Sequence, residues 1–300
     1  MSDDLMDTGL MAVPNCSEGT DAAGIDRLVR ACRIPGVRVL NVHSDADHDR
    51  TVITLSGAAG ALVDAGVSLA TAARDIIDLP GQHGVHPRVG ALDVLPFVAL
   101  DESRMPAAIA AADQAAARIA GEVGIPCLRY GRGAGEGRER PAHLRARGLP
   151  ALAAAMAQGD VVPDAGPAVP HPSAGVTLVG ARGPLIAWNM WLTDGDVDDA
   201  RAIAAAVREG GDGGGLPGVR ALGLMCRHTG LAQVSMNIED YRRTPLCDVV
   251  ARVRSEAARR GRIIGTSELV GLVPRDALTG ITPASLGLPR FNPAQIIPED

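Results

Sequence analysis

The segment 83–97 combines the residue types in this chain that are best suited to chemistry. It reads HGVHPRVGALDVLPF and joins a polar loop to an apolar run typical of a strand. Pro87 restricts the residue before it, so the backbone at His86 is expected to be extended. An imidazole titrates near neutral pH and can both accept and donate a proton, which makes His86 the candidate general acid–base. The alternative is a loop histidine that only binds a neighbouring carbonyl group.

A second polar segment, HSDADHDR at 43–50, offers a different chemistry. Imidazole and carboxylate groups of two loops together are the ligand types of a zinc site, and the candidates are His43, Asp45, Asp47, His48, His83 and His86. This set defines an alternative function, a metal-dependent hydrolase. No helical pair of ligands supports it, and the segment is also compatible with a solvated hairpin tip.

Composition limits the classes of function. The chain has 300 residues, 46% of them hydrophobic, which is enough to bury a substantial core in more than one small domain. A net charge of −6 without a long basic run argues against a nucleic-acid partner. The apolar stretches are too short to span a bilayer, and the acidic start of the chain does not resemble a signal peptide. We therefore expect a cytoplasmic protein, with residues 1–11 as a disordered extension.

All 29 basic side chains are arginine, because the sequence contains no lysine. Schiff-base chemistry on lysine, a P-loop lysine and a lysine base are excluded. Arginine must therefore make every positively charged contact with a carboxylate ligand, in a two-pronged geometry. The five cysteines have no CxxC spacing, which indicates reduced thiols, and Cys32, Cys127 and Cys247 are expected to be small buried residues.

Two halves are expected, 1–184 and 185–300, both of α/β (α+β) class. In the first half, helices are predicted over 20–32, 57–78, 105–123 and 144–156, and strands over 37–42, 51–55, 92–100 and 126–130. In the second half, strands over 185–192, 219–225, 232–238 and 262–266 enclose helices over 197–208 and 245–260. That order is the ferredoxin-like βαββαβ pattern. Each half should form a mixed or antiparallel sheet with helices on its outer face. Thr20 and Thr244 are predicted N-caps.

Several segments resemble the glutamate formimidoyltransferase (formiminotransferase) family. They are VPNCSEG at 13–19, GVHPRVGALDVLPF at 84–97, VPDAGPAVPHPSAGVTLVGAR at 162–182, GLAQVSMNIED at 230–240 and GTSELVGLVP at 265–274. The resemblance implies two α/β subdomains whose sheets face each other, with folate bound in the cleft between them. It also implies a homodimer, a stand-alone form without a cyclodeaminase domain, and no metal.

The resemblance also implies roles for residues of this chain. His86 would be the catalytic acid–base, and the folate-binding segment would comprise Gly166, Pro167, Ala168, Val169, Pro170, His171, Pro172, Ser173, Ala174 and Gly175. Alternation along two strands places Asn189 and Gln233 where they would bind the pterin ring of folate. The candidates for substrate binding are Arg50, Arg88, Arg182 and His43. For each arginine the alternative is a structural ion pair. His43 and Asp49 differ from the usual residues of the family.

The implied reaction transfers a formimidoyl group from N-formimidoyl-L-glutamate to tetrahydrofolate, the co-substrate. A folate amine attacks the amidine carbon and the amine of glutamate leaves, so that a single histidine can take one proton and return it. Transfer of formyl from N-formylglutamate, or action on 5-formyltetrahydrofolate, is the close alternative. A folate-binding protein without catalysis is another. The expected partners are small-molecule substrates.

Overall fold

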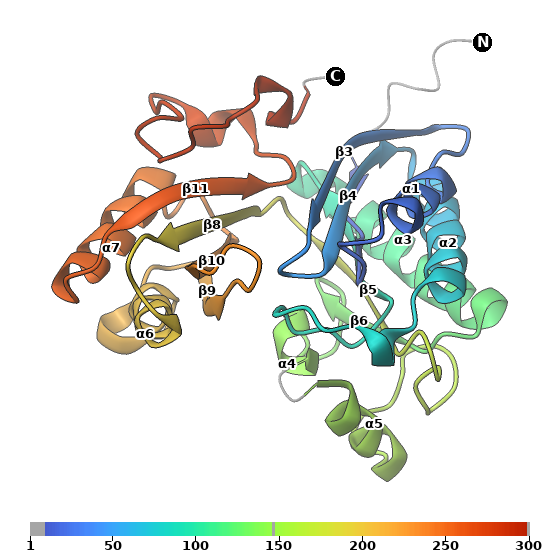
Figure 1. Ribbon diagram of the computed structural model, residues 1–300. Helices are drawn as coiled ribbons and strands as arrows, with labels where there is room; N and C mark the ends of the chain where they lie inside the picture. Colours follow the sequence, from blue (N-terminus) through green and yellow to red (C-terminus); the bar gives the residue numbers. More distant parts are fainter. Residues whose placement is uncertain (1–9, 146–147, 299–300) are drawn as a thin grey trace. The chain divides into compact units, whose positions relative to one another are not determined.

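The computed structural model describes residues 10–145 and 148–298. The chain divides into two compact units, the first ending at Gly183 and the second beginning at Pro184. Each unit contains one sheet and its own helices, and the expected mixed α/β class is confirmed (Figure 1). Within the described ranges, every helix is too short or too polar to cross a membrane.

The sheet of the first unit has seven strands and mixed direction. They are β1 (Leu10–Ala12), β2 (Asn15–Cys16), β3 (Val37–Asp45), β4 (Arg50–Gly57), β5 (Leu92–Ala99), β6 (Cys127–Gly131) and β7 (Thr177–Arg182). The short strands β1 and β2 both lie between β4 and β5, and β3 pairs with the other edge of β4. These pairs are antiparallel, whereas β5, β7 and β6 run parallel. The antiparallel part therefore brings the β3–β4 hairpin and the start of β5 to the same end of the sheet.

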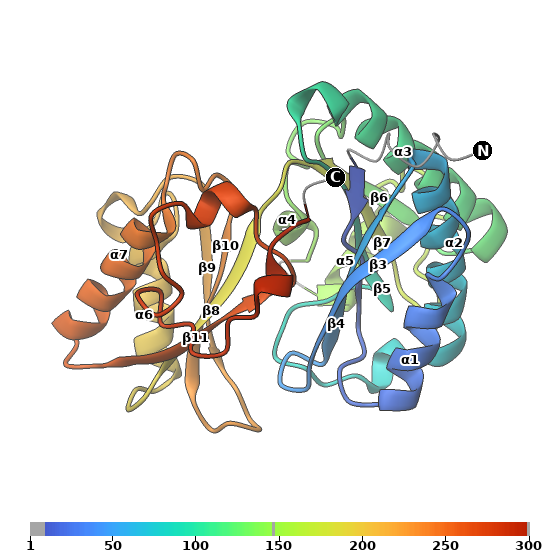
Figure 2. The same cartoon turned by 90° about the horizontal axis from the view of Figure 1, so that it is seen from above.

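Helices cover both faces of this sheet. Figures 1 and 2 show α1 (Ala22–Ala31), α2 (Ala59–Ile76) and α3 (Met105–Arg118) along one face, where the main core includes Leu28, Leu62 and Phe97. A π-helical turn, Ile119–Val123, extends α3 and ends at Gly124. The other face carries a smaller core in which Leu152 and Met156 of α5 (Gly148–Gln158) are buried. Before it lies the short α4 (Pro141–Arg145).

The second unit has the expected βαββαβ order. It consists of β8 (Ile186–Leu192), α6 (Val197–Val207), β9 (Val219–Met225), β10 (Ala232–Ile238), α7 (Leu246–Arg259) and β11 (Ile264–Val270). The strands form one antiparallel sheet in the order β11–β8–β10–β9. The two helices pack on one face, so Trp188, Met190 and Val234 are buried against Ile203 and Val249. Short 3-10 turns in the two units are Leu79–Gly81, Glu102–Arg104, Asp212–Gly214, Arg275–Leu278 and Pro293–Gln295.

Several element boundaries differ from the prediction. Asp21, not Thr20, caps α1, since its side chain accepts the Ala23 N–H and is a stronger cap than threonine. Helix α7 starts at Leu246, and the Thr244 hydroxyl donates to the Pro217 carbonyl instead of capping. The predicted helix over 144–156 is two helices, α4 and α5. Leu10 and Met11, expected in an extension, belong to β1, and the rest of that extension lies outside the described residues.

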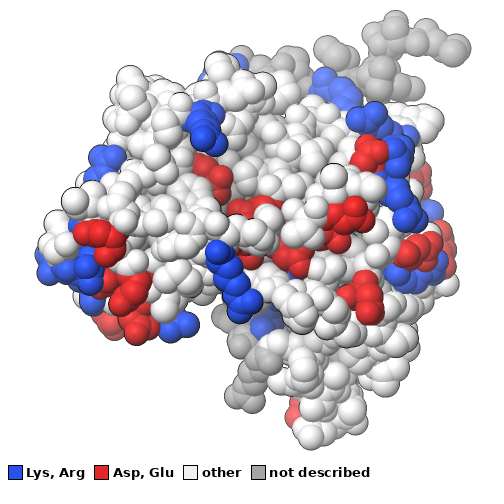
Figure 3. Space-filling model, in the orientation of Figure 1, with Lys and Arg blue, Asp and Glu red and all other residues white. Residues whose placement is uncertain are grey.

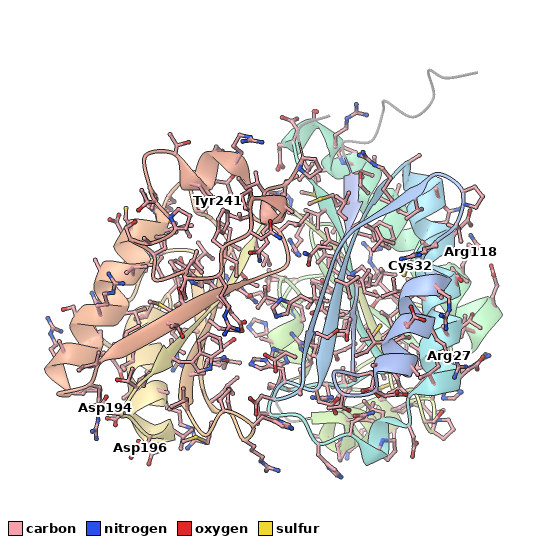
Figure 4. All side chains as sticks on the ribbon, turned by 45° about the horizontal axis from the view of Figure 1, so that its top comes forward. Arg27, Cys32, Arg118, Asp194, Asp196 and Tyr241 are labelled. Carbon is pink, nitrogen blue, oxygen red and sulfur yellow. The ribbon has the colours of Figure 1, made fainter. Side chains whose placement is uncertain are left out.

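Figure 4 labels two side chains near the ends of helices, Asp196 and Cys32. Asp196 accepts the backbone N–H groups of Asp198 and Asp199 and so begins α6. Cys32 follows the last residue of α1 and is fully buried, as predicted. Cys247 is exposed, contrary to prediction, because it stands on the solvent side of α7. On the face drawn in Figure 3, arginine and acidic side chains are interspersed.

Candidate active site

Three segments that are distant in sequence meet at the start of β5. The loop before β5, residues 83–91, is called the signature loop. Its Val85 N–H donates to the Asp47 carbonyl of the β3–β4 turn at 3.0 Å. The Ser17 hydroxyl donates to the Gly90 carbonyl at 2.7 Å. Because these bonds join different strands and loops, the polar motifs at 13–19, 43–50 and 83–93 form one structure rather than three independent loops.

Arg88 holds the β3–β4 turn against the signature loop. Its guanidinium donates to the Asp49 carbonyl at 2.8 Å and to the His48 carbonyl at 2.5 Å, and it lies 3.5 Å from the Asp49 carboxylate. Asp49 has a left-handed backbone (φ +48°) and its side chain accepts the Gly19 N–H. Asp49 and His48 are buried, so the interpretation of this turn as a solvated hairpin tip is wrong. These contacts favour the structural alternative for Arg88 over the binding of a donor carboxylate.

His86 is fixed through one ring nitrogen. Its Nδ1 lies 2.8 Å from the Pro87 carbonyl and 3.4 Å from Arg50 Nη1. We assign the proton to Nδ1, because a carbonyl at that distance needs a donor and the arginine contact is longer. This tautomer leaves the lone pair on Nε2. The His48 ring stands beside it, with centroids 5.7 Å apart.

The surroundings of His86 disfavour its charged form. Desolvation, followed by the positive charges of Arg50 and Arg145 and the neighbouring His48, holds the pKa of His86 well below its ordinary value. The hydrogen bond with Pro87 acts in the opposite direction and does not offset them. A neutral imidazole at neutral pH is the form that accepts a proton, so this histidine is prepared to act as a base.

Asp93 is the central acidic group of the site, and sequence reasoning did not select it. Its side chain is fully buried and accepts Arg50 Nη1 at 2.9 Å and Arg145 Nη1 at 2.7 Å. Its other oxygen accepts the Val89 N–H at 2.8 Å. One carboxylate therefore joins β4, α4 and the signature loop. The only sequence signal was a single acidic residue inside an apolar, strand-like run.

A β-bulge places Asp93 in this position. Strand β2 pairs Asn15 with Val94 and Cys16 with Leu92, so Asp93 is the extra residue between two consecutive pairs. A bulge re-aims a side chain locally while the strand continues. This is how a charged residue is accommodated in a strand that is otherwise apolar and buried.

The charges around Asp93 do not cancel. Burial by itself would raise the pKa of Asp93, but Arg145 and Arg50 outweigh it and the net shift is downward, so the group is ionised. Burial lowers the pKa of Arg50 to about 10, which still leaves it protonated at neutral pH. Two guanidinium groups thus share one carboxylate beside His86, and this group has an excess of one positive charge.

The end of the predicted folate-binding segment lies against the signature loop. His171 and Gly175 exchange backbone hydrogen bonds of 2.9 Å, and the His171 ring accepts the Ala174 N–H at 3.1 Å. This turn then bonds to the loop, with the Ala91 N–H donating to the Ala174 carbonyl at 2.9 Å. Residues 166–169 are exposed. The segment therefore combines a fixed turn beside the His86 loop with an accessible stretch before it.

Gly175 allows this close approach. It has φ +68°, and a Cβ there would lie 2.2 Å from the Val89 carbonyl oxygen. We expect Gly175→Ala to lower the melting temperature and raise the KM for folate, since the left-handed backbone alone costs roughly 1–2 kcal/mol and the loop must also shift. Gly159→Ala is the control, because Gly159 has φ +80° and open space around it. Equal effects of the two substitutions on folate KM would contradict the role of the close approach.

Asn189 and Gln233 lie on the face of the second sheet that the helices do not cover. Their neighbours Trp188 and Val234 point into the helix-covered core, as alternation requires. Asn189 is opposite Ser235 across the strand pair, and its amide donates to Glu268 at 3.0 Å. The face is thus polar at its centre.

The remaining predicted residues lie elsewhere in the first unit. His43 is on β3, paired with Val52 of β4. Arg182 ends β7 and donates to the Gly183 carbonyl at 2.9 Å.

The six ligands of the alternative metal site all fall within described residues, and no three of them bring ligand atoms within 4.8 Å of one another. Burial raises the pKa of the Cys16 thiol strongly, so this cysteine is not a reactive thiolate.

Comparison with known proteins identifies the family. The N-terminal subdomain of the formiminotransferase domain matches residues 9–182, and the formiminotransferase domain matches residues 187–283. The chain belongs to the formiminotransferase family. The resemblance carried by the sequence motifs is thereby confirmed, and the bonded loops described above all fall in the matched N-terminal subdomain.

Relatives in this family are similar over nearly the whole chain. A glutamate formimidoyltransferase of Streptococcus pyogenes is 37% identical over 93% of this chain and 94% of its own length. The glutamate formimidoyltransferase of Thermoplasma acidophilum is 36% identical over 95% of this chain and 94% of its own length. A formimidoyltransferase-cyclodeaminase of Sus scrofa is 38% identical over 89% of this chain, which corresponds to 50% of the relative.

Proposed function

We propose that this protein transfers the formimidoyl group of N-formimidoyl-L-glutamate to tetrahydrofolate, as a folate-dependent transferase. The observation that carries the proposal is the neutral His86, held through Nδ1 with Nε2 as its accepting atom, in a loop bonded to the 171–175 turn. The names of the relatives, which this chain matches nearly end to end, support the same reaction.

The chemistry needs one base that later acts as an acid. The folate N5 amine attacks the amidine carbon, and His86 Nε2 takes the proton from that nitrogen as the new C–N bond forms. The tetrahedral intermediate then breaks its bond to the glutamate nitrogen, which receives the proton from the imidazolium. The products are 5-formimidoyltetrahydrofolate and glutamate, and the histidine returns to its neutral form. No covalent enzyme intermediate is required.

The excess positive charge beside His86 suits an anionic donor. Arg50 and its neighbours can bind a carboxylate while they disfavour a second cation, the imidazolium, before the reaction starts. Folate would contact the 166–175 segment, with Asn189 and Gln233 contributing hydrogen bonds from the second unit. His43 and Arg182 remain candidates for substrate contact. A homodimer and a cytoplasmic location are further predictions from the family.

A comparison of donors tests the function. Purified protein with tetrahydrofolate should release glutamate from N-formimidoyl-L-glutamate faster than from N-formyl-L-glutamate. A preference for the formyl donor would replace the proposal by the close alternative. Tight binding of folate without turnover of either donor would indicate a folate-binding protein. A stoichiometric bound metal whose removal abolishes activity would favour the hydrolase.

The pH dependence tests the role of His86. Since its pKa is held below the ordinary value of about 6.5, the neutral base should persist at mildly acidic pH. We expect kcat/KM to be constant around neutral pH and to fall only as the pH drops below that value, through the lowered pKa. A profile in which activity is already half lost above the ordinary histidine pKa would contradict a base in these surroundings.

A further inference from the structure

Arg145 belongs to the same charged group as the candidate catalytic residue, although it comes from a separate element. It is the last residue of α4, and the exposed fraction of its side chain is 13%. Its Nη1 donates to Asp93, which also binds Arg50, and Arg50 Nη1 lies 3.4 Å from His86. The charge of Arg145 acts on His86 directly, after that of Arg50. Arg145 is therefore within electrostatic reach of the reacting atoms.

Arg145 also has donor capacity that the fold does not use. Its Nε is buried and finds no hydrogen-bond partner among the described residues. Leaving a buried guanidinium N–H unbonded is costly unless a ligand satisfies it. Asp93 supplies one negative charge to the two guanidinium groups of Arg50 and Arg145. The charges of these three side chains therefore balance only when a further carboxylate binds.

We propose that Arg145, together with Arg50, binds the α-carboxylate of the donor amino acid next to His86. The inference rests on the proposed function and names a specificity-determining residue for it. The α-carboxylate is attached to the same carbon as the nitrogen that carries the transferred group, whereas the γ-carboxylate is at the far end of the side chain. Arg50, which contacts the histidine, and Arg145, which shares Asp93 with Arg50, are therefore placed for the α-carboxylate. Asp93 acts as a positioning residue, because it fixes both guanidinium groups.

Arg145→Gln should raise the KM for N-formimidoyl-L-glutamate by about 10- to 100-fold, the value of a charged hydrogen bond, and leave the KM for tetrahydrofolate nearly unchanged. The KM of Arg145→Lys for the same donor should lie between those of wild type and Arg145→Gln, since a lysine keeps the charge but lacks the two-pronged guanidinium geometry. Arg132→Gln is the matched control: it removes an exposed arginine of the preceding loop that pairs with Glu102. If Arg145→Gln lowers the melting temperature and changes both KM values equally, Arg145 only anchors α4 and the proposal is wrong.

The donor itself provides a test that does not depend on the stability of a variant. In the wild-type protein, N-formimidoyl-γ-aminobutyrate, which lacks the α-carboxylate, should have a much higher KM than the natural donor. Arg145→Gln should bring the KM values of these two donors close together. N-formimidoyl-2-aminobutyrate, which lacks the γ-carboxylate, should remain as sensitive to Arg145→Gln as the natural donor. An unchanged ratio of the first two donors in the variant would overturn the assignment.

A pH profile tests the placement of Arg145 beside His86. The charged and titratable groups around His86 are Arg50 on β4, Arg145 on α4, His48 on the turn, Asp93 on β5, and Arg88 paired with Asp49. Removing the charge of Arg145 should shift the acidic limb of kcat/KM to higher pH, and the control Arg132→Gln should not. No shift in the limb would contradict the placement of Arg145 beside the reacting centre.

Equilibrium binding distinguishes failure of the inference from failure of the function. L-Glutamate and γ-aminobutyrate are the probes, titrated calorimetrically into wild-type protein and Arg145→Gln. Preference for glutamate that disappears in the variant supports the subsite, even if formimidoylglutamate is not turned over. Turnover of formimidoylglutamate with glutamate affinity independent of Arg145 leaves the function standing and overturns the subsite.

Discussion

The His86→Ala protein should lose about 10²- to 10⁴-fold in kcat, the usual contribution of a general acid–base, while its affinity for folate persists. The loss should be large because both proton transfers pass through this imidazole, held between the Pro87 carbonyl and Arg50. Single-turnover rates with saturating donor and folate measure it, and folate affinity is measured separately by titration.

His83→Ala is the matched control for this experiment. His83 is in the same loop but exposed, and it should be replaceable with little change in turnover. A His86→Ala protein that turns over within a few-fold of wild type would remove His86 from the mechanism. A comparable loss in both variants would indicate that the loop, rather than one imidazole, is what the reaction needs.

Asp93→Asn should be the most destabilising substitution in the site. Asparagine keeps the shape and can still accept the Val89 N–H, but it leaves Arg50 and Arg145 facing each other without their shared negative charge. Removing one partner from a buried ion pair costs about 3–5 kcal/mol. Urea unfolding of the two proteins at neutral pH measures the difference in free energy of unfolding.

The pH dependence of stability gives an independent check on Asp93. Its folded-state pKa is lowered, so the stabilisation is present above the unfolded-state pKa and is lost as the pH falls toward the folded-state value. The Asp93→Asn protein should lack this acidic loss. Glu122→Gln, which removes an exposed partner of Arg118, is the control and should change stability little. Equal stability of Asp93→Asn and wild type would contradict a charged Asp93.

The sequence predicted the fold of the second unit well, because each of its elements has a simple pattern. Strands such as Ala232–Ile238 alternate, and the helices have clear apolar faces, so βαββαβ followed directly. The first unit was harder. Its β1 and β2 are three and two residues long, too short for any periodicity, and they are strands only because β4 and β5 flank them.

The candidate site was predicted only where its residues are close together in the sequence. The His86 loop could be found because reactive residues and glycines are adjacent in sequence. Asp93 and Arg145 could not be paired, since they are 52 residues apart and Asp93 lies inside a buried strand. Arg88 is predicted to bind substrate because it lies inside a motif that resembles the family. Its actual partners are backbone carbonyls of a turn some 40 residues earlier.

The close approach of 171–176 to the signature loop has a consequence for the synthesis of this protein. The hydrogen bond between Val176 and Val89 and that between Ala174 and Ala91 join segments more than 80 residues apart. Contacts at such separation form late, because the intervening chain must first be ordered. A nascent chain that has released the histidine loop from the ribosome therefore still lacks the turn that supports it. The histidine loop should therefore become ordered in one step, when the strand Thr177–Arg182 joins the sheet, and this step marks the completion of the first unit.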